Sequence, residues 1–238
     1  MKKSILNSES YSPLYRQLMQ RLKNEIASGV YPVHSRIPSE QQLCDTYQVS
    51  RVTVRKALTT LVREGLLLRH QGKGTFVAVP RIQRDLKEVT SFHTACQMKG
   101  CTASSRVIHA MLQHATQEDE ESLHLSPGKM VLEICRLRSA DHSPVMIETN
   151  HFSDSYAFLL EEDLTGSLYE ILLKHGIEPQ QAVHDIALSY ASTSQAKLLE
   201  VEAGAALLLL TECVFDQNGT PLHTSKQLIR GDRFTFRI

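Results

Sequence analysis

The 238-residue chain has no tryptophan, no excess of either charge and only five cysteines. The cysteines form no Cys-x-x-Cys pair and are odd in number, which argues against a disulfide framework or a zinc site. Free thiols in a reducing, cytoplasmic setting are therefore expected. No uninterrupted apolar run approaches the roughly 20 residues of a membrane helix, and the polar first residues do not resemble a secretory signal. We expect no membrane partner, no metal and no cofactor.

The balanced charge hides a difference between the two parts of the chain. Residues 1–80 hold 12 Lys and Arg against 5 Asp and Glu, whereas residues 81–238 hold 14 against 21. A basic module joined to an acidic one predicts that only the first binds a polyanion. Chance clustering of surface charge is the alternative. The length and a hydrophobic content of 42% suit two ordinary globular domains.

Periodicity and capping signals predict three helices in the basic part. Ser12 precedes Pro13 and an apolar stripe that ends before Gly29, so we expect Ser12 to cap the first helix. Ser39 and Gln42 have the spacing of a capping box before a short helix over residues 40–47. After a tight turn, a third helix is expected from Ser50 to residue 63 or 64.

Two short helices joined by a tight turn form a helix-turn-helix, whose second helix enters the DNA major groove. Ser50, Arg51, Thr53 and Arg55 lie in the first turns of this helix, where they can contact phosphates and base edges. Taken singly, such arginines could be solvated surface charges. Their position within this order of elements favours DNA binding.

A glycine-rich hairpin follows the third helix. Strands are predicted over residues 66–69 and 75–77, with Gln71-Gly72-Lys73-Gly74 as the turn between them. A cation at the tip of such a turn is typical of a wing that lies along the DNA backbone or minor groove. The simpler interpretation is that the glycines only allow the hairpin to turn.

This part of the chain resembles the DNA-binding domain of the GntR family of bacterial repressors. The likeness rests on Pro38-Ser39-Glu40, the run from Val49 to Leu58, Glu64-Gly65-Leu66 and the run from Gly72 to Val77. It implies a winged helix-turn-helix and a homodimer on a short palindromic double-stranded DNA operator. By analogy, the DNA contacts would come from Arg36, Gln41, Ser50, Arg51, Thr53, Arg55, Gln71, Gly72, Lys73 and Gly74.

The remaining sequence predicts a second, α+β domain. Residues 79–89 are polar and interrupted by proline, so we expect domains at 1–78 and 90–238 with this stretch as the linker. Beyond it, short helices are interspersed between hairpins, one of them turning at Asn218-Gly219. This pattern favours a mostly antiparallel sheet covered by helices on one side.

Candidate ligand-binding residues in the second domain include two arginines on one strand face. Arg136 and Arg138 are two residues apart and could bind a phosphate or carboxylate. Glu148 lies on the expected hairpin partner, so a cross-strand salt bridge is the alternative. Ser167 and Tyr169 begin a helix, where their hydroxyls suit a phosphate, although a plain helix cap needs only Ser167.

The second domain resembles the UTRA ligand-binding domain of the HutC-type branch, which has a chorismate-lyase-like fold. The matching stretches are Thr90-Ser91-Phe92, Arg136-Leu137-Arg138, Ile147-Glu148, Gly166-Ser167-Leu168-Tyr169 and the run from Arg230 to Phe236. The likeness is to regulators that sense an amino-sugar 6-phosphate. It implies that the phosphate and sugar are held by Ser91, Arg136, Arg138, Ser167 and Tyr169. The corner at Arg230-Gly231-Asp232-Arg233 is expected to be a structural turn with Asp232 paired to an arginine.

One position departs from those amino-sugar sensors. They have a glutamate where this chain has His223 and a tyrosine where it has Ile229. A histidine, especially a protonated one, suits a carboxylate. We therefore hypothesise an effector that keeps the phosphate but differs at its other end, such as a sugar phosphate conjugated to an amino or carboxylic acid. An exposed His223 with no ligand role is the alternative.

Three functions remain to be compared. A repressor released by a small phosphorylated effector uses both domains. A constitutive DNA-binding protein would use the second domain only to dimerise. A lyase-like enzyme is the third alternative, but we find no catalytic constellation, and an enzyme would not need the basic domain.

Overall fold

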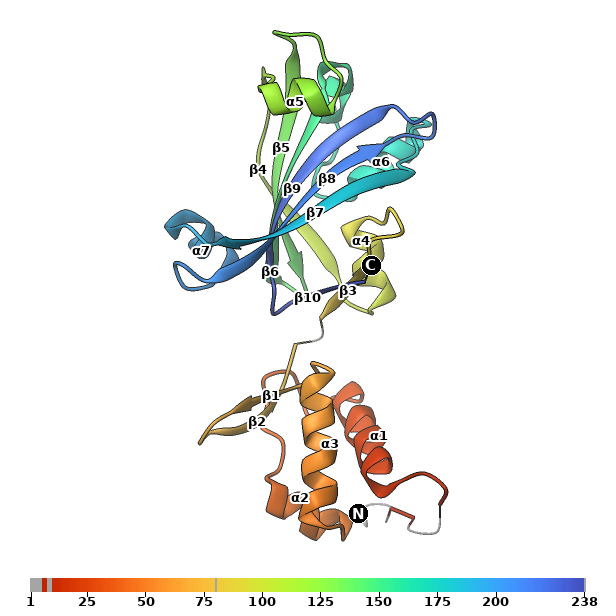
Figure 1. Cartoon of the computed structure of the whole chain (residues 1–238), viewed down its shortest axis with the longest axis vertical. Coiled ribbons are helices and arrows are strands. Elements are labelled where there is room, and N and C mark those ends of the chain that lie inside the picture. The colour runs from red at the N-terminus through yellow and green to blue at the C-terminus, as the bar shows by residue number, and fades with distance from the viewer. Residues whose placement is uncertain (1–5, 8–9, 80, 238) are drawn as a thin grey trace. The chain divides into compact units, whose positions relative to one another are not determined.

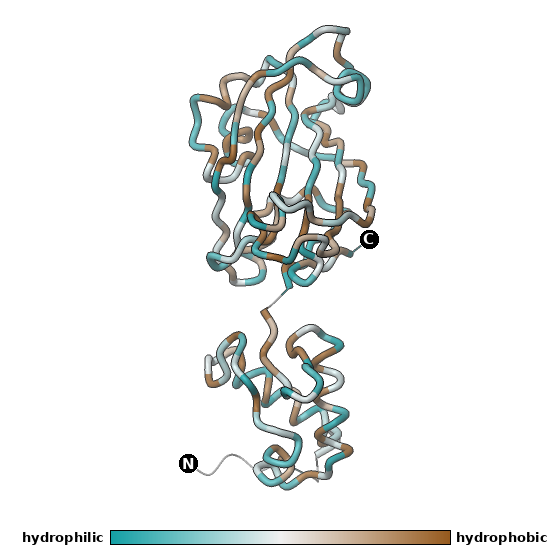
Figure 2. The backbone as a smooth tube through the Cα atoms, turned by 90° about the vertical axis from the view of Figure 1, so that its left-hand side faces the viewer, coloured by the Kyte–Doolittle hydropathy of each residue, from teal (hydrophilic) through white to brown (hydrophobic). Residues whose placement is uncertain are grey.

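The chain folds into two compact units. The computed structural model describes residues 6–7, 10–79 and 81–237. An N-terminal unit, Met1–Arg81, is followed by a C-terminal unit, Ile82–Ile238 (Figure 1). Each unit has hydrophobic clusters of its own, and apolar residues recur along the strands and helices of both (Figure 2). In the described ranges, no helix is long and apolar enough to cross a membrane.

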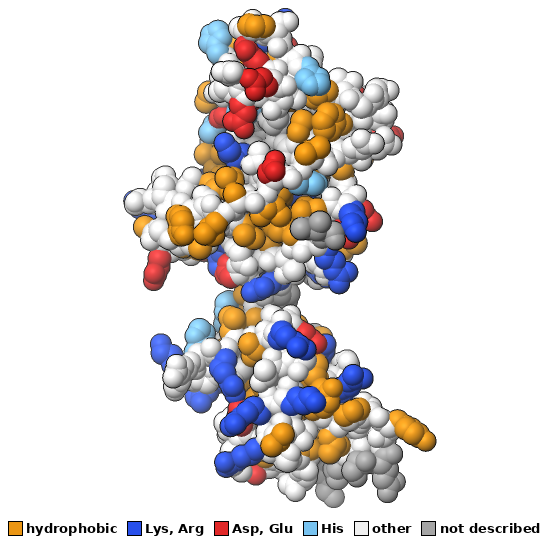
Figure 3. Space-filling model, viewed as in Figure 1, with side chains coloured by type: hydrophobic (Ala, Val, Ile, Leu, Met, Phe, Trp, Pro, Cys, Tyr) orange, Lys and Arg blue, Asp and Glu red, His pale blue; other side chains and the backbone are white. Residues whose placement is uncertain are grey.

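The surface charges follow the difference seen in the sequence. Lys and Arg side chains gather over the visible face of the N-terminal unit, whereas acidic side chains gather towards one end of the C-terminal unit (Figure 3). The basic face therefore belongs to the unit that carries the expected DNA-binding elements.

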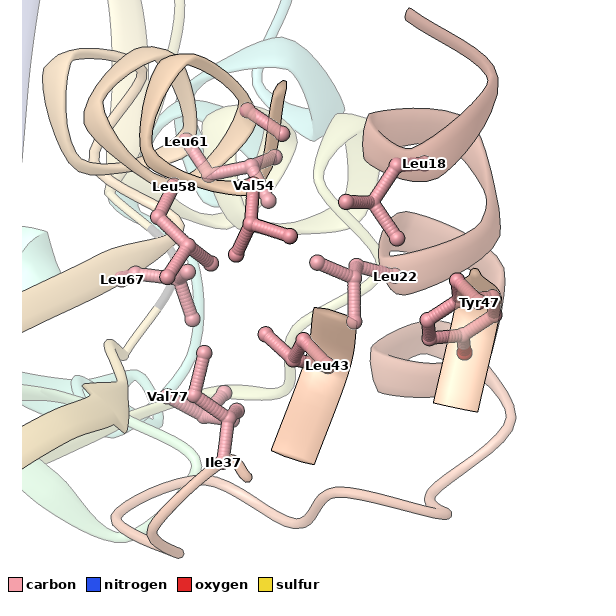
Figure 4. Close-up of a cluster of buried hydrophobic side chains, with 11 residues drawn as sticks. Leu18, Leu22, Ile37, Leu43, Tyr47, Val54, Leu58, Leu61, Leu67 and Val77 are labelled. Carbon is pink, nitrogen blue, oxygen red and sulfur yellow. The ribbon is translucent and has the colours of Figure 1, made fainter. Parts of the chain in front are cut away.

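The N-terminal unit has three helices and a hairpin around one core. Its elements are α1 (Leu14–Ala27), α2 (Glu40–Tyr47), α3 (Arg51–Arg63), β1 (Leu67–His70) and β2 (Gly74–Val77). Leu18 and Leu22 of α1 meet Val54 and Leu58 of α3, and Leu43 of α2 completes the contact (Figure 4). These helices thus bury the apolar stripes that the sequence predicted, while their polar faces stay outside.

The helix caps agree with the sequence at two of three sites. Ser39 and Gln42 form the expected capping box, and the Ser50 side chain accepts from the Thr53 N–H. Ser12, however, does not cap α1. Pro13 occupies the N-cap position and makes no side-chain hydrogen bond. The helix begins one residue later than predicted, because the extended backbone at Pro13 places Ser12 outside the first turn.

The C-terminal unit is built on a six-stranded antiparallel sheet with the order β4-β5-β6-β9-β8-β7. The strands are β4 (Ala103–His114), β5 (Met130–Ala140), β6 (Ser143–Ser153), β7 (Gln181–Tyr190), β8 (Ala206–Phe215) and β9 (Pro221–Arg230). The helices are α4 (Phe92–Met98), α5 (Gln117–Ser122), the 3-10 helix η1 (Asp154–Glu161), α6 (Leu168–Lys174) and α7 (Thr193–Leu199). This arrangement confirms the α+β fold with a mostly antiparallel sheet.

Helices pack on both faces of the sheet rather than on one. Leu132 and Ile134 of β5 belong to the cluster that η1 and α6 cover. Cys135 and Leu137 of the same strand belong to a second cluster, under α7. Since successive residues of a strand point to opposite faces, α7 covers the face opposite α6.

The predicted linker is partly a strand. The polar composition of residues 79–89 predicts a linker, but Ile82–Asp85 forms β3, which pairs in parallel with β10 (Phe234–Arg237). Ile82 and Arg84 are buried, while Gln83 and Asp85 are only half-buried. Over residues 82–85 the structure thus differs from the expected linker, because the partner of β3 is distant in sequence and a four-residue strand carries little local signal.

Candidate DNA interface and effector pocket

Contacts between side chains join the first turn of α3 to α2. The Ser50 hydroxyl caps α3 and lies 2.9 Å from the Thr53 hydroxyl. Arg51 Nη2 donates to Gln41 Oε1 at 2.6 Å. Arg51, Gln41 and Ser50 are exposed, so this arrangement presents donors at the surface where the helix begins.

Glu40 links the predicted recognition helix to the hairpin. Its carboxylate accepts from Arg55 Nη2 at 3.2 Å and from Arg69 on β1. Partial burial alone would raise the pKa of Glu40. The hydrogen bonds and charges of Arg55 and Arg69 outweigh this effect and hold the pKa below its usual range. The ionised Glu40 therefore orients two exposed guanidinium groups on the same side of the unit.

The hairpin has a turn at Gln71, Gly72 and Lys73, and all three are exposed. Gly74 has φ +121°, and a Cβ there would lie 2.6 Å from Arg36 Nε. Arg36 also forms an isolated bridge with Phe76. The absence of a side chain at Gly74 thus lets Arg36 lie against the base of the hairpin.

These contacts bring together residues that the sequence analysis expects to contact DNA. Arg36 joins the hairpin, Gln41 joins Arg51, and Arg55 shares Glu40 with β1. The ten predicted positions are therefore distributed over adjoining segments of one unit.

The C-terminal unit contains a pocket between the sheet and the segments that pack on it. All seven predicted effector residues line it, namely Ser91, Arg136, Arg138, Glu148, Ser167, Tyr169 and His223. Ser91 and Ser167 are the N-cap residues of α4 and α6. The structure thus brings residues from distant parts of the sequence to one place.

The structure contains the cross-strand salt bridge that was the alternative to ligand binding, and Arg138 keeps two donor atoms outside it. Arg136 forms an ion pair with Glu148 across β5 and β6, and its Nη1 donates to the carbonyls of Leu164 and Gly166. Arg138 Nη1 is 3.7 Å from the Glu148 carboxylate, beyond hydrogen-bond distance. Arg138 is 2% exposed, and its Nη1 and Nε have no hydrogen-bond partner among the residues described. Buried donors of this kind are costly unless an acceptor reaches them.

Glu148 interacts electrostatically with both Arg136 and Arg138. Burial alone would raise the pKa of Glu148, but the adjacent Arg136 and Arg138 lower it to about 2. Burial, assisted by Arg136, lowers the pKa of Arg138 to about 10 against the opposing effect of Glu148. Glu148 and Arg138 are therefore both charged near neutral pH, and two arginines face one carboxylate.

His223 is buried, so the alternative of an exposed histidine is wrong. Burial lowers its pKa, which favours the neutral ring. Its Nδ1 lies 3.2 Å from the Thr224 carbonyl and must donate there, which leaves Nε2 as an acceptor 3.4 Å from the Tyr169 hydroxyl. This geometry suits a hydroxyl or ammonium on a ligand, not the carboxylate that a protonated His223 would bind.

Several pocket residues were missed by the sequence analysis. Arg84 of β3 donates from Nη2 to Glu212 at 2.7 Å and from Nη1 to Gln227 at 3.1 Å. Phe92 lies under Arg138, whose guanidinium carbon is 4.7 Å from the ring centroid. The alternation of Ile82, Arg84 and Leu86 was the one signal that could have indicated a strand with Arg84 on its buried face.

The corner after β9 is structural, as expected. Arg230 and Asp232 form an ion pair at 2.9 Å, and Arg230 also donates to the carbonyls of Pro144 and Leu199. These contacts fix the turn that leads into β10.

A basic helix-turn-helix unit followed by a ligand pocket in an α+β unit defines a transcription regulator with an effector domain. Residues 14–77 match the family described as bacterial regulatory proteins, gntR family, and residues 98–235 match the UTRA domain. The chain belongs to the GntR family of transcription regulators, in the group that carries a UTRA domain.

Individual relatives cover nearly the whole chain. It is 35% identical to the HTH-type transcriptional repressor NagR of Bacillus subtilis over 97% of this chain and 96% of the relative. It is 32% identical to the probable fructoselysine utilization operon transcriptional repressor of Escherichia coli, over 96% and 95%. The crystal structure of PhnF from Mycobacterium smegmatis covers 94% of this chain and 97% of its own, with a TM-score of 0.79 at 27% identity. The first two of these relatives are named as transcriptional repressors, not as enzymes.

Proposed function

We propose that this protein is a homodimeric repressor that leaves a palindromic operator when a phosphorylated small molecule occupies the pocket. The supporting observation is the buried Arg138, whose Nη1 and Nε lack an acceptor within the described part of the chain. Arg136 and Arg138 together exceed the charge of Glu148, and Ser91 and Ser167 add hydroxyls to the same pocket. A phosphate supplies several anionic acceptors at once and suits this set.

The other end of the effector is proposed to carry hydrogen-bond donors. Neutral His223 has its acceptor Nε2 in the pocket, 3.4 Å from the Tyr169 hydroxyl, where a ligand donor would have to replace that hydroxyl. Glu212 is an ionised carboxylate in the same pocket. Fructoselysine, for which one relative is named, is a sugar joined to an amino acid. A sugar phosphate, or a sugar phosphate conjugated to an amino acid, fits both ends of the pocket.

A thermal-shift panel tests the ligand class. The panel contains glucose 6-phosphate, glucosamine 6-phosphate and fructoselysine 6-phosphate, each with its unphosphorylated partner. A ligand that binds only the folded state raises the melting temperature by mass action. We expect a rise that requires the phosphate, disappears in Arg138→Gln and persists in Arg106→Gln, which changes an exposed arginine of β4. An equal rise with the unphosphorylated partners would contradict the proposal.

For the DNA side, we propose that Arg36, Gln41, Ser50, Arg51, Thr53, Arg55 and the hairpin tip contact the operator. The exposed guanidinium of Arg51 at the start of α3 supports a base contact. Arg51→Ala should abolish selective binding to a duplex that the protein itself selects in vitro, while sedimentation still shows a dimer. Retained selectivity would exclude the recognition role of Arg51.

A further inference from the structure

Strand β3 connects the effector unit to the chain that comes from the DNA-binding unit. It begins at Ile82, directly after the residue at which the two units divide. Its backbone pairs with β10, where the Ile82 N–H donates to the Arg233 carbonyl and the Leu86 N–H donates to the Arg237 carbonyl, both at 2.8 Å. Strand β3 is therefore the first element of the effector unit after this division, and β10 holds its backbone in place.

Glu212 of β8 is bonded to β3 and lies beside a second residue that contacts the same segment. Its carboxylate accepts from Arg84 Nη2 at 2.7 Å, and its Oε1 lies 2.9 Å from His184 Nδ1 of β7. The other ring nitrogen of His184, Nε2, is 3.1 Å from the Leu86 carbonyl and donates to it. The buried carboxylate thus reaches β3 through the side chain of Arg84, and His184 lies between this carboxylate and the residue that follows β3.

The same cluster lines the effector pocket. Arg84, Glu212 and Gln227 all face it, together with Arg136 and Arg138. Gln227 donates to Glu212 and accepts from Arg84, so the three side chains form one connected group. Arg84 Nε lacks a hydrogen-bond partner within the described residues. A ligand polar group that reaches Glu212 or Gln227 adds to, or replaces, the contacts that hold Arg84.

We propose that Arg84 and Glu212 are the positioning pair through which occupancy of the pocket moves β3 and changes operator affinity. The inference rests on the proposed function of the pocket as the effector site. A ligand shifts a conformational equilibrium only through contacts that differ between its two states. The Arg84–Glu212 contact supplies such a difference, because a ligand that bonds to Glu212 changes the attachment of β3.

Hydrogen–deuterium exchange on the full chain tests the attachment without any effector. The variants are Arg84→Gln, the double variant Arg84→Gln/Glu212→Gln and Lys87→Gln as the control, since Lys87 is exposed in the same segment. The double variant removes both charges and so avoids an unpaired buried carboxylate. We expect exchange in the peptide covering residues 82–86 to become about 10-fold faster in the first two variants, in line with freer local opening, and to stay at the wild-type rate in the control. Unchanged exchange in both Arg84 variants would overturn the proposal.

The coupling itself is measured as a ratio of operator dissociation constants. Each protein is titrated with and without the panel sugar phosphate that most raises the wild-type melting temperature. Typical coupling gives a ratio of about 5 to 150. We expect the wild-type ratio in Lys87→Gln, a ratio near 1 in Arg84→Gln, and partial recovery in Arg84→Lys, which restores the charge.

A purely structural salt bridge gives a different result. It would lower the melting temperature of Arg84→Gln but leave the ratio at the wild-type value, and that outcome would refute the positioning role. If no sugar phosphate raises the melting temperature of the wild-type protein, the proposed function fails instead. The exchange experiment still decides whether Arg84 and Glu212 hold β3.

Discussion

Gly72 and Gly74 lie two residues apart in the hairpin but face different constraints. Both have positive φ, yet only at Gly74 would a Cβ approach Arg36, at 2.6 Å, while at Gly72 nothing lies within 4 Å. Gly72 has φ +73°, which asparagine also adopts, whereas φ +121° at Gly74 is accessible chiefly to glycine.

We expect Gly74→Ala to lower the free energy of unfolding by about 1–3 kcal/mol, the usual range for a strained backbone. It should also displace Arg36 and weaken operator binding. Gly72→Asn should keep the wild-type free energy of unfolding, because nothing lies within 4 Å of a Cβ there. Urea unfolding compares the two variants, and mobility shifts measure operator binding by Gly74→Ala. Equal losses of stability in the two variants would contradict the prediction.

His223 should make stability depend on pH. Burial lowers its pKa in the folded state, so the unfolded chain takes up the proton first as the pH falls. The stability contributed by the neutral ring is therefore present above the unfolded pKa of about 6.5 and is lost as the pH falls below it. His223→Gln should flatten the dependence of the free energy of unfolding on pH between about 7.5 and 5.5. His114→Gln, at an exposed position, should not.

At the scale of elements, the local capping signals at Ser39 and Ser50 were reliable, whereas pairings between distant segments could not be predicted. The capping box of Ser39 and Gln42 could be predicted because both residues lie within one turn of helix. The parallel pairing of β3 with β10 could not, since nothing near Ile82 specifies Phe234 as its partner. For the same reason, Arg136 and Arg138 were found from their spacing, whereas Arg84 was assigned to a linker.

The N-terminus of α1, which Ser12 does not cap, can be compared directly with that of α2, which Ser39 does cap. Ser39→Ala removes a side-chain acceptor of the Gln42 N–H and should lower the free energy of unfolding by about 1 kcal/mol. Ser12→Ala should leave it within about 0.5 kcal/mol of wild type, as for other surface substitutions, because Ser12 caps nothing. Chemical unfolding of both variants checks this, and a larger loss in Ser12→Ala would restore the original prediction.

For the whole molecule, the segregation of charge predicts how salt acts on each function. Operator affinity should fall steeply with salt, since each phosphate contact releases counterions. Lys73→Ala should reduce the slope of log affinity against log salt by about 1 for each copy bound. Arg106→Ala, in the acidic unit, should leave the slope unchanged. Binding isotherms at several salt concentrations measure the slopes of both variants. Equal slopes for wild type and Lys73→Ala would show that the hairpin tip does not contact DNA phosphates.

The parallel pairing of β3 with β10 also has a consequence for how the protein is made. A ribosome delivers β3 long before β10, so Arg84 emerges early while the strand beside it, with Phe234 of the pocket wall, emerges late. The N-terminal unit can fold in the meantime, because its core draws only on residues already synthesised. A chain cut short by a premature stop codon before β10 would therefore retain the whole core of its N-terminal unit and lack one wall of the pocket, so a nonsense mutation here should separate the fates of the two units.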